Sequence, residues 1–236
     1  MCTIIAVPDP NPKYEFFFFA NRDRPTDPFY GNYLKFFPNT KVIGIYDVRS
    51  EGLACGYSLE SGVYAGVANI GKYRGTKSRG IFIKNILTKA KDIHGAVRMA
   101  ESELVDGAYS SASYLIGQKG NNWLLENYGR TVYTERLSGT FILTNYFTGR
   151  KGEVVEEARL RRNYVHRQLS KSSTINIEDI MRIVAHHSSR DGICRHGITL
   201  ASLFVAGRKD GETKVLFKIG ETCQGLHSVF DVYPHL

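Results

Sequence analysis

A cysteine directly follows the first methionine, and this position can do chemistry that is closed to an internal cysteine. Methionine aminopeptidase generally tolerates a small second residue, so removal of Met1 would make Cys2 the amino terminus. Its α-amino group, with a pKa of about 8, could then act as the base for its own thiol, and the thiolate is the attacking form. The sequence therefore predicts Cys2 as a nucleophile that needs no histidine. A small buried hydrophobe in a first strand is the simpler alternative.

A second candidate for chemistry is the basic, glycine-rich stretch at residues 71–80, which leads into a predicted helix. Backbone N–H groups at a helix start, together with Lys and Arg side chains, could hold an anion such as a phosphate or a carboxylate. The stretch lacks the GxxxxGK[ST] spacing and the flanking acidic metal ligand of a Walker loop. A solvated loop is the simpler alternative here.

Four side chains late in the chain, His186, His187, Cys194 and His196, could in principle form a zinc site. Their spacing, however, matches no standard zinc pattern. The cysteines at positions 2, 55, 194 and 223 also lack CxxC spacing, which indicates neither a zinc ribbon nor a dense disulfide framework. We therefore predict reduced thiols, no metal and no cofactor.

Composition limits the class of protein. The 236 residues are 42% hydrophobic and 23% charged, and no run reaches the roughly 20 apolar residues of a membrane helix, so we expect one domain over residues 1–236 without membrane insertion. The net charge of +8 favours anionic ligands, but Lys and Arg are spread along the chain, and nucleic acid is not a predicted partner. The start lacks the pattern of a secretory signal, which favours a cytoplasmic protein. A homo-oligomer is left open.

The candidate residues must be positioned by short strands and helices that follow one another in blocks. Strand-like runs occupy residues 2–7, 14–20, 42–48 and 62–70, each bounded by Pro, Gly, Asn or Asp. The aromatic run at 16–19 is typical of a strand covered on both faces. Two helices are predicted next, at residues 82–90 and 93–104, followed by a meander of four strands at 114–118, 123–128, 131–136 and 140–144. Two more helices, at 154–169 and after 176, precede two strands at 198–206 and 213–219. This order favours α+β layers.

Four segments resemble, in order, the family named for its Asn-Arg-Asp-Glu motif, the transport-and-Golgi-organization (NRDE) type. They are MCTII at residues 1–5, ANRDRP at 20–25, ANI at 68–70 and KSRG at 77–80. Arg24 stands where the naming motif has its glutamate. The order and spacing of these segments carry the resemblance more than any one of them.

The same skeleton is similar to the wider N-terminal-nucleophile group of penicillin V acylase, bile-salt hydrolase and acyl-CoA:isopenicillin N acyltransferase. Cys2-Thr3 resembles the first residues of that group, and Asn21-x-Asp23 resembles the loop that carries its catalytic aspartate. The strand at 62–69 resembles its Gly-rich strand ending in Asn, and Leu143-Thr144-Asn145 resembles its second asparagine. Segments at 191–196 and 220–223 resemble late parts of the acyltransferase branch.

The resemblance implies catalytic roles for these polar residues. Asp23 would hydrogen-bond and orient the Cys2 amine. Asn69 and Asn145 would offer neutral amide N–H groups to a tetrahedral oxyanion without competing as bases. Ordinary turn chemistry beside a proline is the alternative for Asn21 and Asp23.

An arginine also belongs to the implied site, and either Arg159 or Arg162 would match it. Such an arginine would lower the pKa of the thiol or hold a carboxylate, although a basic helix face is usually just solvated. We name Arg159 as the catalytic candidate, with Asn21, Arg22, Arg79 and Arg162 as binding candidates.

The expected fold is an α+β, four-layer αββα sandwich of the N-terminal-nucleophile hydrolase type. The expected function is hydrolysis or transfer at a linear amide carbon–nitrogen bond through an acyl-cysteine intermediate, with a small-molecule acyl amide or acyl donor as the partner. The alternative is a non-catalytic carrier of haem, acyl-CoA or a lipid, in which aromatic residues such as those at 16–19 would line a pocket.

Overall fold

Antiparallel strands are the main structural elements of the computed structural model, which describes residues 2–23, 31–70, 73–145 and 155–228. One sheet has six strands in the order β10-β1-β2-β11-β12-β13, and the other has seven in the order β3-β4-β5-β6-β7-β8-β9. The first sheet consists of β10 (Phe141–Leu143), β1 (Ile4–Asn11), β2 (Tyr14–Asp23), β11 (Thr199–Arg208), β12 (Thr213–Ile219) and β13 (His227–Ser228). The second consists of β3 (Asn32–Phe37), β4 (Val42–Asp47), β5 (Gly52–Ser58), β6 (Val63–Asn69), β7 (Ala112–Gln118), β8 (Asn121–Tyr128) and β9 (Thr131–Leu137).

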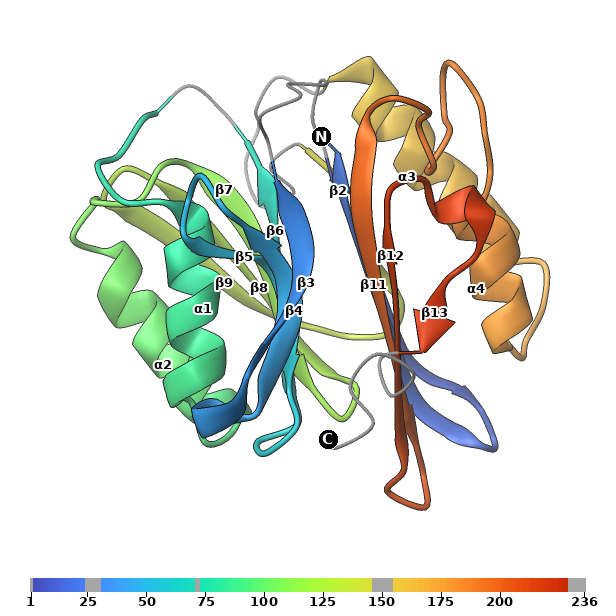
Figure 1. Cartoon of the computed structure of the whole chain (residues 1–236), viewed down its shortest axis with the longest axis horizontal. Helices are drawn as coiled ribbons and strands as arrows, with labels where there is room; N and C mark the ends of the chain where they lie inside the picture. The colour runs from blue at the N-terminus through green and yellow to red at the C-terminus, as the bar shows by residue number, and fades with distance from the viewer. Residues whose placement is uncertain (1, 24–30, 71–72, 146–154, 229–236) are drawn as a thin grey trace.

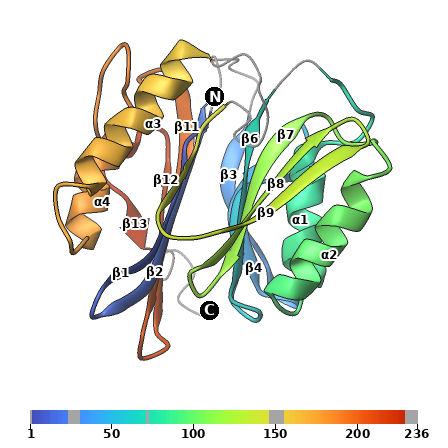
Figure 2. The ribbon, with the colours of Figure 1, turned by 180° about the vertical axis from the view of Figure 1, so that it is seen from behind.

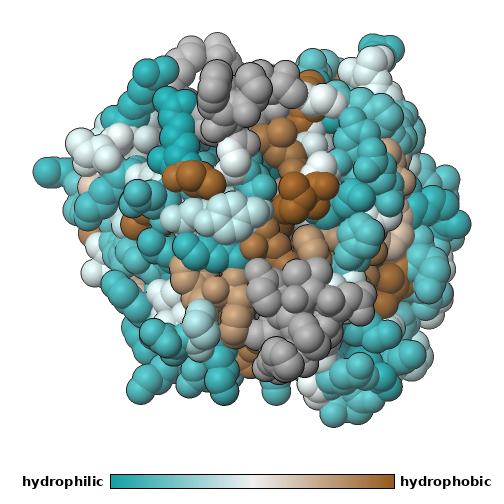
Figure 3. Space-filling view, viewed as in Figure 1, coloured by the Kyte–Doolittle hydropathy of each residue, from teal (hydrophilic) through white to brown (hydrophobic). Residues whose placement is uncertain are grey.

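Four α-helices accompany the sheets in the described part of the chain: α1 (Arg79–Lys89), α2 (Ile93–Leu104), α3 (Glu156–Leu169) and α4 (Ile177–Val184). The first pair lies beside the seven-stranded sheet and the second pair beside the six-stranded sheet (Figures 1 and 2). Apolar side chains fill the space between the two sheets and also the space between each sheet and its helices. On the face shown in Figure 3, apolar side chains gather between the sheets and the flanks are hydrophilic.

The predicted fold class, an α+β four-layer αββα sandwich, is corrected by this strand content. The chain is a mainly antiparallel β protein with two sheets of six and seven strands and, among its described residues, only four helices of 8 to 14 residues. The physical reason is that the chain forms more strands than the sequence pattern assigned, since β3, β5 and the short β13 occupy stretches that the pattern left unassigned.

Strand β2 lies in the middle of the six-stranded sheet, where β1 and β11 flank it. Because side chains alternate along a strand, Phe16 and Phe18 enter the core between the sheets, while Phe17 and Phe19 face the helices. The prediction of a strand covered on both faces is confirmed. Both inner rings stack on Tyr64 of the opposite sheet, at a centroid distance of 4.8 Å each. This packing fixes the depth and direction of the polar end of β2.

Candidate active site

The polar residues Asn21, Arg22 and Asp23 form the last three positions of β2, and all three are buried. The alternation along the strand continues through them. Asn21 and Asp23 therefore point to the side of α3, whereas Arg22 points between the sheets. Cys2 lies just before β1, the strand next to β2, and is 2% exposed. It lies on the same side as Arg22, which is the inner side between the two sheets. One strand end thus supplies polar groups to both sides of the first residues of the chain.

Asp23 is the centre of a buried hydrogen-bond network on the α3 side. Its carboxylate accepts hydrogen bonds from Thr199 Oγ1 at 2.8 Å and from Asn21 Nδ2 at 3.0 Å. It also pairs with the Arg161 guanidinium at 3.3 Å, and both side chains are 1% exposed or less. Burial raises the pKa of Asp23, and the Arg161 charge and the Thr199 hydrogen bond oppose that rise.

The arginine that reaches this network is Arg161, and the predicted candidates lie elsewhere on α3. The buried stripe of that helix consists of Ala158, Arg161, Val165 and Leu169, which recur at helical spacing. Arg159 projects from the exposed side and pairs with Glu156, so the structure does not bring it to the candidate site, and Arg161 is the arginine of α3 that lies there. Arg162, one position further on, is half-buried and lies outside the stripe.

Asn145 connects Cys2 to the seven-stranded sheet. Its Oδ1 accepts a hydrogen bond from the Cys2 backbone nitrogen at 2.5 Å, and its Nδ2 donates to the Asn69 carbonyl oxygen at 2.8 Å. Arg161 also donates to Oδ1 at 3.5 Å. Both polar ends of the Asn145 side chain are therefore occupied, so this residue holds the Cys2 nitrogen. The Asn69 side chain, in contrast, is exposed at the end of β6.

On the inner side, Arg22 joins the Cys2 thiol to a second buried carboxylate. Its guanidinium donates to Asp47 Oδ2 at 2.7 Å, at the end of β4. Burial lowers the pKa of Arg22, but the charges of Cys2 and Asp47 and the hydrogen bonds to both outweigh it, so the net pKa is raised. Asp47 also accepts from the backbone nitrogens of Arg49 and Ser50, which fixes its orientation. The arrangement places a held positive charge beside the thiol.

A cavity of about 750 Å³ opens over the Arg22–Asp47 pair, and Cys2 lies beneath Arg22 without lining it. Arg22, Asp23 and Asn69 form part of its wall, and the segment before α1 forms another part. That segment contributes Lys77 and Arg79, and Ser78 caps the helix by accepting from the Gly80 nitrogen at 3.1 Å. The described residues that line the cavity include four cationic side chains, at positions 22, 49, 77 and 79, and no aromatic ring.

Arg79, the first residue of α1, is held in place by a hydrogen bond. Its Nε donates to the Ser111 carbonyl at 2.9 Å. Burial lowers the pKa of Arg79, and the nearby Arg22 charge acts in the same direction, while Tyr114 and Cys2 oppose it. Two partly desolvated guanidinium groups therefore face one cavity, which is suited to an anion.

The structure brings together Cys2, Asn21, Arg22, Asp23 and Asn145, and places the Asn69 and Arg79 side chains on the cavity. Arg24, which departs from the naming motif, lies outside the described residues. Sequence reasoning missed three members of the site, Asp47, Arg161 and Thr199. A signal existed for Arg161, because it is the one charged residue in an otherwise apolar helical stripe. No local pattern marks Asp47 or Thr199: strand pairing brings Thr199 to Asp23, and packing of one sheet on the other brings Asp47 to Arg22.

No protein-family model matches this chain, and comparison with curated proteins finds no match. The resemblance to the NRDE family therefore stays a prediction. In the described part of the chain, no helix is both long enough and apolar enough to cross a membrane.

Proposed function

We propose that this chain is an amidohydrolase or acyltransferase that acts on a linear amide carbon–nitrogen bond through Cys2, within the NRDE family of N-terminal-nucleophile proteins. One observation carries the proposal: the Asn145 side chain accepts a hydrogen bond from the Cys2 nitrogen at 2.5 Å, while the charge of the buried Arg22 guanidinium interacts with the Cys2 thiol. A cysteine that served only as a small apolar side chain would not need a cation beside its thiol.

The chemistry requires removal of Met1, which converts the Cys2 nitrogen from an amide to an amine. The amine accepts the thiol proton, and the thiolate attacks the substrate carbonyl carbon, which forms a C–S bond and an oxyanion. Collapse of this intermediate breaks the C–N bond, and the Cys2 ammonium returns the proton to the leaving amine. Water or a second amine then attacks the acyl-cysteine and frees the thiol.

The surrounding residues have separate roles in this proposal. Asn145 orients the Cys2 nitrogen, and the buried Asp23–Arg161 pair holds the end of β2 against α3. Asn69, whose side chain is exposed on the cavity wall, is the better candidate for an oxyanion donor, because its amide is not tied to Cys2. This differs from the expectation that both asparagines would serve the oxyanion.

The cavity supports an anionic group on the substrate. Arg22, Arg49, Lys77 and Arg79 line it together with the start of α1, and that combination binds carboxylates and phosphates. The carrier alternative rested on aromatic residues lining a pocket. Phe16 to Phe19 instead pack in the cores and are 3% exposed or less. A carrier function is therefore an outcome of the test below.

Met1-free protein, confirmed by intact mass, should be incubated with acyl amides that do or do not carry a carboxylate. We expect an acyl adduct on the Cys2 peptide during turnover, with the carboxylate-bearing amides preferred. The Cys2→Ala variant should give no adduct, while Cys55→Ala, which also removes a buried thiol, should form one. Absence of both adduct and turnover across the panel would refute the enzyme proposal, and saturable binding of haem or acyl-CoA by the same sample would favour a carrier.

A further inference from the structure

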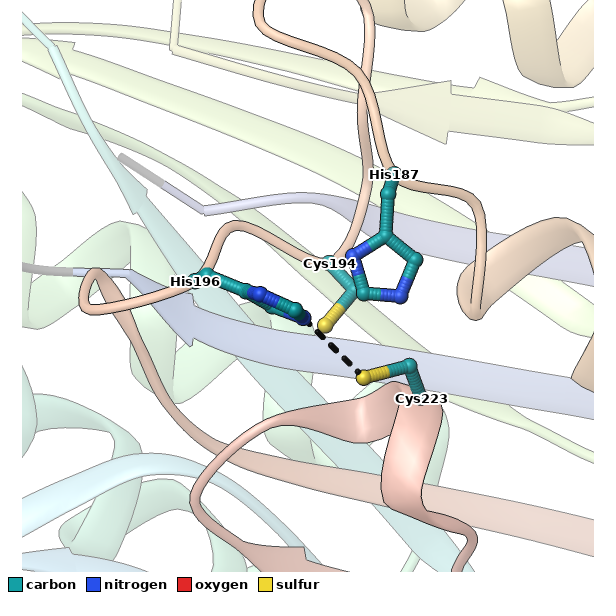
Figure 4. Close-up of side chains that lie close together, drawn as sticks. All are labelled: His187, Cys194, His196 and Cys223. Carbon is teal, nitrogen blue, oxygen red and sulfur yellow. Dashed lines mark hydrogen bonds between the residues drawn. The ribbon is translucent and has the colours of Figure 1, made fainter.

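We propose that His187, Cys194, His196 and Cys223 form a zinc site on the side of the six-stranded sheet that α3 and α4 cover. One ligand atom from each residue, an imidazole nitrogen or a thiol sulfur, lies within 4.8 Å of every other. Figure 4 shows the four side chains converging from two separate segments. This site replaces the earlier expectation of no metal, and it differs from the four residues that the sequence suggested.

Strand pairing explains why the cluster forms. Three of the residues lie on the segment between α4 and β11, and the fourth lies in the short 3-10 helix Thr222–Gln224 that follows β12. β11 and β12 are antiparallel neighbours with Ala201 opposite Ile219, so the chain before β11 and the chain after β12 emerge at the same end of the sheet. The ligands are therefore 27 to 36 positions apart in sequence across this junction, which is why no local motif reveals them.

The distances fit a tetrahedral ion with modest adjustment. Zinc bonds of about 2.0–2.1 Å to nitrogen and about 2.3 Å to sulfur require ligand atoms about 3.3–3.8 Å apart. His196 Nε2 lies 3.4 Å from Cys223 Sγ, which already matches such an edge. The largest separation, 4.8 Å, would have to shorten by about 1 Å, and the His187 and His196 side chains are exposed enough to move by that amount.

The chemistry of the ligands selects the ion. Two thiols and two imidazoles form the Cys₂His₂ set of structural zinc sites, whereas magnesium and calcium prefer oxygen. The Glu221 carboxylate lies 3.3 Å from His196 Nε2 and accepts from the Gly197 nitrogen, which adds negative charge beside the ligands. A depression of about 470 Å³, lined in part by His187, Cys194 and His196, gives a metal ion access.

His186, which the sequence also suggested, belongs to a different contact. Its ring stacks on Tyr164 of α3 at a centroid distance of 4.0 Å, and its Nε2 lies 3.2 Å from Asp191. Its carbonyl oxygen accepts hydrogen bonds from the nitrogens of Ile193 and Cys194. The backbone around Cys194 is therefore already held, so metal binding would need only small side-chain movements there.

The site would fasten a segment that contacts the candidate active site. The Ile193 carbonyl, adjacent to Cys194, accepts a hydrogen bond from Asn21 Nδ2 at 2.9 Å. Asn21 in turn accepts from the Thr3 nitrogen at 2.5 Å. A bound zinc ion would therefore hold Cys194 and, through its neighbour Ile193, the contact with Asn21 beside the first residues of the chain. Its role there would be structural. The inference itself does not depend on the proposed amidohydrolase activity.

The test uses the full-length chain, reduced and stripped of metal, and titrates it with Co²⁺ as a spectroscopic substitute for Zn²⁺. We expect about one ion per chain, the intense d–d bands of tetrahedral cobalt, and a thiolate-to-metal charge-transfer band. His196→Gln and Cys223→Ser alter side chains that are not fully buried, so these variants should fold. Each should bind at least about tenfold more weakly, and Cys223→Ser should lose about half of the charge-transfer intensity per bound ion.

Two matched controls should bind Co²⁺ with the affinity and spectrum of the wild type: His94→Gln, at an exposed histidine on α2, and Cys2→Ala, which lies outside the four proposed ligands. Zn²⁺ should raise the Tm of the wild type and of both controls, and at the same concentration should raise that of His196→Gln by less. Equal binding by His196→Gln and the wild type, an octahedral cobalt spectrum, or failure to bind metal by protein whose Cys194 and Cys223 are shown to be free thiols would overturn the assignment.

Discussion

Replacing Arg161 by methionine tests the buried pair that holds the end of β2 against α3. Arg161 and Asp23 lie 3.3 Å apart, with side chains 1% and 0% exposed. At an effective dielectric constant of about 20, two unit charges at this distance attract by about 5 kcal/mol. Removing one partner leaves a buried carboxylate without its counter-charge, which typically costs about 3–5 kcal/mol. We therefore expect Arg161→Met to lower the free energy of unfolding by about 3–5 kcal/mol at pH 7.

The loss should depend on pH in a definite direction. Burial raises the pKa of Asp23 in the folded protein, and loss of the Arg161 charge raises it further. Well below pH 4, which is about the pKa of an unfolded Asp, the carboxyl is protonated in both folded and unfolded chains, so the variant loses little. As pH rises from there towards the raised folded pKa, the unfolded chain releases its proton while the folded chain retains it. Stability then falls, by up to about 1.4 kcal/mol per pH unit.

Urea denaturation at pH 5 and pH 7 measures both effects. The difference in the free energy of unfolding between variant and wild type removes the contributions of titratable groups that both proteins share. Arg159→Met is the matched control, because Arg159 lies on the same helix and pairs with Glu156 in solvent. It should follow the wild type at both pH values. The double variant Arg161→Met with Asp23→Asn should recover part of the lost stability. A deficit equal to that of Arg159→Met, or one that does not shrink at pH 5, would refute the role assigned to this pair.

Three further predictions concern the asparagines, the glycines and the thiols. Asn69→Ala should lower kcat about 10²–10³-fold with little change in Tm. Asn145→Ala should also lower the free energy of unfolding, by about 1–3 kcal/mol, because its hydrogen-bond partners are buried. Activity and urea denaturation, measured on the same samples, separate the two effects. Gly52→Ala should destabilise the fold, since an added Cβ would lie 2.1 Å from the Gly80 backbone, while Gly95→Ala on α2 should stabilise it by roughly 0.5–1 kcal/mol; thermal melts compare them. Brief iodoacetamide labelling at pH 7 should modify Cys2 before Cys55, because burial raises the pKa of Cys55 to about 12; preferential labelling of Cys55 in peptide maps would contradict this.

The strands that the sequence pattern left unassigned show where local reasoning ends. Strand β5 carries Gly52 and Gly56, and glycine is depleted in strands because it has no side chain to pack. Here the missing side chains are required. A Cβ on Gly56 would lie 2.8 Å from Leu87 of α1, and one on Gly52 would collide with the start of that helix. The glycines let α1 approach the sheet, which depends on tertiary packing that no local pattern expresses.

The same limit of local reasoning applies to the residues of the candidate site. Cys2, Asn21, Asp23 and Asn145 could be named because each belongs to a short segment with recognisable order in the chain. Arg161 could have been found from helix periodicity, because it interrupts an apolar stripe and a charged residue there needs a buried partner. Asp47 and Cys223 could not, because their neighbours are supplied by strand pairing and by the packing of one sheet on the other.

The two clusters on the α3 side are connected through Asn21, and this connection determines how their effects combine. Asn21 Oδ1 holds the Thr3 nitrogen, and its Nδ2 donates both to Asp23 and to the Ile193 carbonyl. Movement of the segment at 193–196 would therefore displace the Asp23 carboxylate and the first peptide units of β1. Because residues that share a hydrogen-bond network do not act additively, loss of zinc and loss of Arg161 should weaken the same buried assembly, so that their combined cost is smaller than the sum of the two. The Arg22–Asp47 pair lies on the opposite side of β2, but Arg22 interacts with Cys2, and Asn145 links Cys2 to Arg161, so loss of Arg22 and loss of Arg161 should not be simply additive either.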